Sequence, residues 1–179
     1  RRAARVDAVG IVGGNSQAVT VANTAAADGF SERLGIQSAG VTGNFALTMM
    51  LEPALLAPVL SQPSLPLDDP AGLEISPEEL LVVRRRLERD DLSVMAYRFA
   101  GDRFCTAQRF AAYEAALGDR FVARVLPDDA ANADCPPFFA EVVGCPHSVV
   151  TVHLVDEAGQ PTIAARDEIL AFFARRLRA

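Results

Sequence analysis

Apolar and polar positions divide the chain into short segments that alternate between strand-like and helix-like patterns. Short apolar runs bounded by turn residues predict strands, at residues 6–12, 54–60, 92–99 and 121–126. Segments with helical periodicity or capping signals predict helices, at residues 44–51, 77–89, 106–117, 138–143 and 162–177. Because strands alternate with helices, the pattern predicts an α/β fold with a mainly parallel sheet flanked by helices.

The segment 42–67 is the centre of this pattern. Residues 44–51 are apolar on nearly every side, which predicts a buried helix. Glu52 and Pro53 end that helix, and the continuous apolar run 54–60 predicts a strand covered on both faces. The glycine-containing turn before the helix suits a nucleophile elbow, a tight strand-to-helix turn that lifts one side chain above a sheet.

Residues 1–41 are poorly patterned, and we expect a short helix near 25–34. Gly10, Gly13 and Gly14 follow a strand-like run but do not form the G-x-G-x-x-G fingerprint, so a dinucleotide site is not favoured. The chain starts at Arg1, without an initiator methionine, which suggests a fragment or trimmed protein. Its 179 residues fit one domain, 1–179.

Composition and charge exclude several function classes. The net charge is −6 and the arginines are dispersed, which argues against a nucleic-acid partner. No apolar run reaches the ~20 residues of a membrane span. The three cysteines are odd in number and form no C-x-x-C pair, which fits a reducing, cytoplasmic setting. The run Arg84–Arg86 is predicted to be a solvated helix face, not an anion site.

Several motifs resemble the dienelactone hydrolase family of α/β-hydrolases. They are TGNFAL with APVLSQPSLP in the segment 42–67, GDRFCTAQR at 101–109, and PHSVVTVHLVDEAGQPT at 146–162. The resemblance covers residues 42–177 and implies a partial α/β-hydrolase fold. It also implies hydrolysis of a small-molecule ester or lactone through an acyl-enzyme, without a cofactor or metal.

Two residues are candidates for the acid and the base of such a site. Asp102 directly follows a predicted strand, and in the family's acid loop Gly precedes the triad aspartate. His147 stands in a late loop, Cys145–Ser148, which resembles the loop of the family's catalytic histidine. His153, the second of two histidines, lies in an apolar run and is predicted to be structural or edge-facing. The order of acid and then histidine fits an α/β-hydrolase.

The nucleophile has three alternatives. If TGNFAL keeps the family's register, the attacking residue should stand at Gly40, which has no side chain. Ser38 can serve if the turn is shifted by two residues, because residues 36–40 imitate G-x-S-x-G with Ile36 at the first position. Alternatively, Val9–Gly13 is the true elbow strand and about thirty residues have been inserted after it.

A second hypothesis, from another class, is a non-catalytic homologue or incomplete fragment that keeps the fold. Absent early strands would leave the first strand with an unpaired edge, so we expect self-association. A metal site is not favoured, because Cys135, Cys145, His147 and His153 give the spacing C-x9-C-x-H-x5-H, which matches no common zinc pattern.

Overall fold

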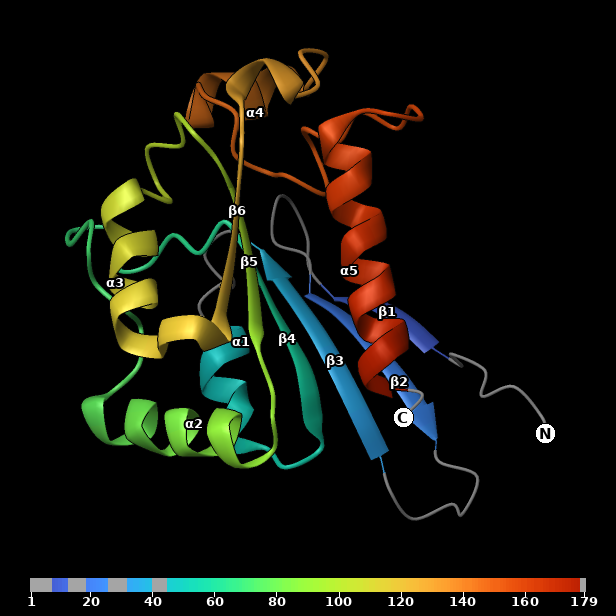
Figure 1. The fold of residues 1–179 in the computed structure, drawn as a ribbon. Helices are drawn as coiled ribbons and strands as arrows, with labels where there is room; N and C mark the ends of the chain where they lie inside the picture. Colours follow the sequence, from blue (N-terminus) through green and yellow to red (C-terminus); the bar gives the residue numbers. More distant parts are fainter. Residues whose placement is uncertain (1–7, 13–18, 26–31, 40–44, 178–179) are drawn as a thin grey trace.

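The computed structural model describes residues 8–12, 19–25, 32–39 and 45–177, and side chains from residue 45 onward. Its single sheet has the strand order β1-β2-β3-β4-β5-β6 (Figure 1). The strands are β1 (Ala8–Val12), β2 (Val19–Ala25), β3 (Glu32–Ala39), β4 (Leu55–Ser61), β5 (Val94–Phe99) and β6 (Phe121–Leu126). The first two pairings are antiparallel and the last three are parallel. The predicted α/β fold with a mainly parallel sheet is confirmed.

Helices cover both faces of the parallel part of the sheet. They are α1 (Phe45–Thr48), continued by the 3-10 turn η2 (Met49–Leu51), and α2 (Pro77–Arg89), α3 (Ala107–Leu117), α4 (Pro137–Val143) and α5 (Pro161–Leu177). Figure 1 shows α1, α2 and α3 on one face and α5 on the other. Each face has its own apolar core, one centred on Leu60, Val94 and Phe110, the other on Val59, Tyr97 and Phe172. Alternate residues of β4 and β5 therefore serve opposite cores.

Local signals fix the start of α2 and the end of α3. The Ser76 hydroxyl accepts from the Glu79 main-chain N–H at 3.2 Å, and the Glu79 carboxylate accepts from the Ser76 N–H at 3.1 Å. This is the reciprocal capping box that the sequence predicts, with Pro77 at the first helical position. Gly118, with φ of 59°, ends α3 as predicted.

Two buried arginines hold the ends of β4. At the amino end, the Arg86 guanidinium donates to the main-chain carbonyls of four residues, Met50, Glu52, Pro53 and Leu55. Arg86 is 6% exposed, so the prediction that Arg84–Arg86 form a solvated face is wrong for this residue. Arg84 and Arg85 are exposed as predicted. The distinction is one of helix geometry, because only one of three consecutive residues faces the connection into β4.

At the carboxyl end of β4, Arg109 of α3 holds the loop that follows the strand. Its Nε–H donates to the Gly72 carbonyl at 3.0 Å, and its terminal nitrogens donate to the carbonyls of Pro63, Pro66, Asp69 and Phe104. A guanidinium has five N–H donors, and these five contacts use all of them. Arg109 is 1% exposed. It therefore ties the proline-rich loop and the turn after β5 to one helix.

Two sequence expectations about helices are wrong. The short helix expected near 25–34 is absent where the chain is described, because Ala25 ends β2 and Glu32–Leu34 begin β3. The helix from Phe45 is also not buried on all sides: Ala46, Leu47 and Met50 are buried, whereas Phe45, Met49 and Leu51 are each more than 40% exposed. An apolar pattern on all sides of a helix does not show which side faces the core, and in the structure only one side does.

The first strand lies at the edge of the sheet, as expected, with β2 as its only neighbour among the described strands. An edge strand presents unpaired N–H and C=O groups to other chains. We therefore expect the isolated protein to self-associate, with an average mass that rises with concentration in light scattering. A single monomeric mass over a wide concentration range, with a cooperative melt, would contradict this expectation.

Candidate active site

Asp102 lies in the turn after β5, and the main chain of that turn orients its carboxylate. Oδ1 accepts hydrogen bonds from the N–H groups of Phe104, at 2.9 Å, and Cys105, at 3.0 Å. The side chain is 0% exposed. Since a buried carboxylate needs hydrogen-bond partners for both oxygens, the turn satisfies Oδ1 and leaves Oδ2 for another donor.

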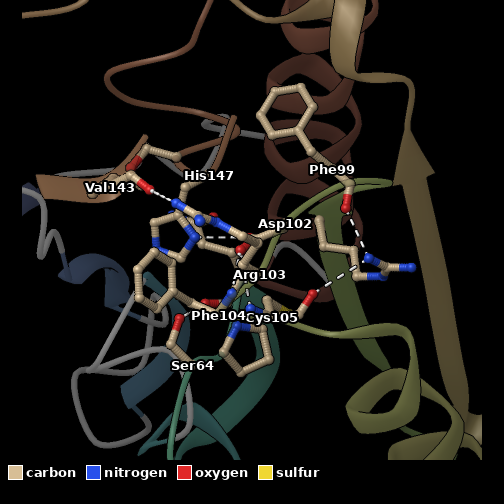
Figure 2. Close-up of polar contacts among 12 residues, drawn as sticks. Ser64, Phe99, Asp102, Arg103, Phe104, Cys105, Val143 and His147 are labelled. Atoms are coloured by element: carbon tan, nitrogen blue, oxygen red, sulfur yellow. Dashed lines mark hydrogen bonds and ion pairs between the residues drawn. The ribbon is translucent and has the colours of Figure 1, made fainter. Parts of the chain in front are cut away.

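His147 supplies that donor. Its Nδ1 lies 2.7 Å from Asp102 Oδ2, and the imidazole is 8% exposed (Figure 2). The ring of Phe104 contacts the imidazole edge-on, at 5.5 Å between centroids. The prediction that Asp102 and His147 meet across the carboxyl ends of neighbouring strands is confirmed. With the Nδ1 proton donated to the carboxylate, Nε2 carries the free lone pair and can accept a proton.

The neighbours of Asp102 tie its turn to the elements around it. The Gly101 N–H donates to Asp128 Oδ1 at 2.7 Å, in the 3-10 turn η4 (Asp128–Ala130). A Cβ on residue 101 would collide with the other carboxylate oxygen of Asp128, so a larger residue here would have to displace that side chain. On the other side, Arg103 donates to the Val143 carbonyl at the end of α4, at 2.9 Å (Figure 2). The turn is therefore anchored to both segments that precede the His147 loop.

The tetrapeptide G-D-R-F occurs twice, and only the first copy builds the site. In the second copy, residues Gly118–Arg120 form a 3-10 turn after α3, and Asp119 is exposed. The sequence correctly predicts a turn for that copy. The two aspartates differ in surroundings, not in local sequence, because the first copy follows a parallel strand and the second follows a helix.

His153 is buried and structural, as predicted, but it does not face an edge. Its Nδ1 accepts from the main-chain N–H groups of His147 and Ser148, each at 3.1 Å. The ring packs edge-on against Phe99 and Phe139, with centroids 6.0 and 5.3 Å apart. The segment around it is a series of turns, so the alternation of apolar residues there did not indicate a strand.

The predicted nucleophile positions fall at the edge of the described residues. Ser38 is in strand β3, where its backbone pairs with Val19 on one side and Leu60 on the other. Gly40 and residues 41–44 lie outside the described residues, as do Gly13 and Gly14. The placement of Ser38 within the strand matches the register in which Gly40 is at the elbow. The role of Ser38 as nucleophile stays a prediction.

Gln62, directly after β4, is a feature without any signal in the sequence. Its backbone has φ of 41°, in the left-handed region that non-glycine residues rarely adopt. The side chain is fully buried, and Oε1 accepts from the Ser61 hydroxyl. Within the described part of the chain, Nε2 has no hydrogen-bond partner. Strained backbone and an unpaired amide are typical of functional sites, and this one follows β4, which lies between β3 and β5, the strand that leads to Asp102.

Cys105 is the thiol nearest to Asp102 in sequence, and it is chemically protected. It is buried, and burial followed by the nearby Asp102 charge raises the pKa of its thiol well above the ordinary value. A thiol that stays protonated is a poor nucleophile. Cys105 is therefore a poor candidate for a nucleophile.

A hollow of about 480 Å³ lies beside the site, lined by α4, η4, Cys135, Cys145 and His153. Across the described ranges, no three His, Cys, Asp or Glu residues are grouped so as to hold a metal ion. Comparison of the chain with protein-family models, curated proteins and solved structures gave no match. None of the described helices is long and apolar enough to cross a lipid bilayer.

Proposed function

We propose that this chain is built as an ester or lactone hydrolase of the α/β-hydrolase type, as its resemblance to dienelactone hydrolases suggests. The observation that carries the proposal is the buried hydrogen bond between His147 Nδ1 and Asp102 Oδ2. A buried carboxylate that orients an imidazole in this way leaves Nε2 as a general base.

Chain topology supports the same proposal. The predicted elbow position, Gly40, follows β3 in sequence, Asp102 follows β5, and His147 lies in the loops after β6. Parallel strands bring their carboxyl ends to one edge of the sheet, where α/β proteins place their sites. The order of elbow, acid and histidine is that of α/β-hydrolases.

In the proposed reaction, His147 Nε2 takes the proton of a nucleophile as it attacks the ester carbonyl carbon. The imidazolium that forms, stabilised by Asp102, then gives this proton to the leaving alkoxide as the carbon–oxygen bond breaks. Water attacks the acyl-enzyme with His147 again as base, which releases the acid and returns a proton to the nucleophile.

A non-catalytic homologue is the second candidate, and the position of Ser38 favours it. Ser38 lies inside β3, which extends to Ala39, and it pairs with Leu60 of β4. Gly40, which the family register places at the elbow, has no attacking group. In this alternative, the acid and base are retained on a scaffold that has lost its nucleophile.

Restoring a nucleophile tests both candidates. We expect the thiol of Gly40→Cys to react with iodoacetamide at pH 6 about tenfold or more faster than an isolated thiol, since a neighbouring imidazolium lowers a thiol pKa. Peptide mass spectrometry would measure labelling at residue 40, with partly exposed Cys135 as an internal reference.

Adding His147→Ala to Gly40→Cys should return the labelling rate to that of an ordinary thiol. Unchanged labelling after loss of His147 would refute the placement of residue 40 beside the base. In the unmodified chain, fluorophosphonate labelling that Ser38→Ala abolishes and Ser93→Ala does not would identify Ser38 as the nucleophile. Absence of labelling would favour the non-catalytic homologue.

A further inference from the structure

The imidazole of His153 holds the loop that carries His147 by accepting hydrogen bonds from its main chain. The Nδ1 atom of His153 accepts hydrogen bonds from two consecutive main-chain N–H groups, those of His147 and Ser148. The main chain of His153 closes the same loop, because its N–H donates to the Ser148 carbonyl at 3.1 Å and its carbonyl accepts from the Asn132 N–H at 2.9 Å. The backbone of His147 is therefore positioned by one imidazole.

These contacts fix the protonation state of His153. A ring nitrogen that accepts two N–H groups carries no proton, so the proton is on Nε2 and the ring is neutral. The ring is 5% exposed and lies between two aromatic side chains, Phe99 and Phe139, which solvate a cation far less than water does. A cationic His153 would lose both hydrogen bonds to the loop.

Charged groups around His153 act in both directions. Burial, followed by the charge of His147, lowers the pKa of His153, and Asp102 opposes this. Four other titratable residues line the hollow that His153 also lines: Asp128, Asp129, Cys135 and Cys145. The Asp128 carboxylate is held by the Gly101 N–H.

We propose that His153 is a positioning residue: by accepting from the His147 and Ser148 N–H groups, it holds His147 in hydrogen-bond contact with Asp102. The role of His147 as a base rests on the proposed function, whereas its contact with Asp102 does not. The consequence is that the acid–base pair is assembled only while His153 is neutral.

Two substitutions distinguish the effect of the hydrogen-bond acceptor, Nδ1 of His153, from the effect of the volume of its ring. His153→Asn would place an amide oxygen near the position of Nδ1 and would not titrate, whereas His153→Leu would fill the space without an acceptor. Because the chain has two histidines, histidine-selective ¹⁵N labelling gives one ring N–H signal for each neutral imidazole. The readout is solvent exchange of the His147 Nδ1 proton relative to main-chain amides of the core, which separates loosening of the loop from a change in overall stability.

With His153→Leu we expect this exchange to accelerate by about tenfold or more, since two hydrogen bonds that restrain the loop are lost. His153→Asn should keep the slow exchange of the native chain. Slow exchange in folded His153→Leu, or fast exchange in His153→Asn, would overturn the proposal.

The pH dependence keeps the test decisive if His153→Leu does not fold. The native chain should lose the His147 Nδ1 signal as acid protonates His153, and His153→Asn should keep the signal to lower pH. Equal acid sensitivity of the two proteins would refute the proposal. None of these measurements needs a nucleophile, so absence of ester hydrolysis would count against the proposed function and leave this inference standing.

Discussion

Asp102→Asn is expected to reverse the tautomer of His147. The Phe104 and Cys105 N–H groups both donate to Oδ1, so an asparagine at this position should place its amide oxygen there. Its NH₂ group would then face His147 Nδ1, which would become an acceptor and move the ring proton to Nε2. The base would lose the lone pair that accepts the proton. We expect ester hydrolysis by any active form of the chain to fall by ~10⁴-fold.

Imidazole ¹⁵N shifts would report this reversal without any activity. The matched control is Asp119→Asn, which changes the same position of the second G-D-R-F copy at an exposed site. We expect that variant to leave the His147 signals unchanged. A His147 ring that keeps its proton on Nδ1 in Asp102→Asn would contradict the assigned role of Asp102.

Arg109→Met is expected to lower the free energy of unfolding by about 3 kcal/mol or more. Methionine matches the arginine side chain as far as Nε and has no donor, so five main-chain carbonyls around the loop after β4 would lose their partner. Urea unfolding would measure the change. Arg109→Lys should recover only part of it, because an ammonium has three donors and no planar fork.

Arg85→Met is the control for this variant, because Arg85 is exposed on α2. We expect it to change stability by less than about 0.5 kcal/mol. A similarly small loss in Arg109→Met would mean that water replaces the guanidinium and that the clamp contributes little.

The sequence predicted those features whose signals are local. The capping box at Ser76 is encoded within four residues, and the turn carrying Asp102 follows an apolar strand directly. For these features, neighbouring residues alone set the hydrogen bonds. The pairing of Asp102 with His147 was predicted from loop positions and family motifs, and the sheet supplies it by aligning strand ends.

Other features that depend on distant partners were not predicted. Arg86 and Arg109 look like ordinary helix-surface residues in sequence, and their carbonyl partners lie mostly more than 30 residues away. His153 was assigned a structural role without a partner, because the main-chain N–H groups that donate to its ring leave no pattern in the sequence. The first strand was predicted, but β2 and β3 were missed because residues 16–38 have few large apolar side chains, which weakened the strand periodicity.

The hydrogen bonds that Arg86 and Arg109 make at the two ends of β4 have a consequence for how the protein would unfold. Arg86 and Arg109 bind main-chain carbonyls, and neither a carbonyl nor a guanidinium changes its charge between mildly acidic and mildly alkaline conditions. The histidine loop, in contrast, is held by groups that do titrate. Acid should therefore release the contact between Asp102 and His147 while the centre of the sheet stays intact, so the loss of this contact and the loss of the fold would be two separate events.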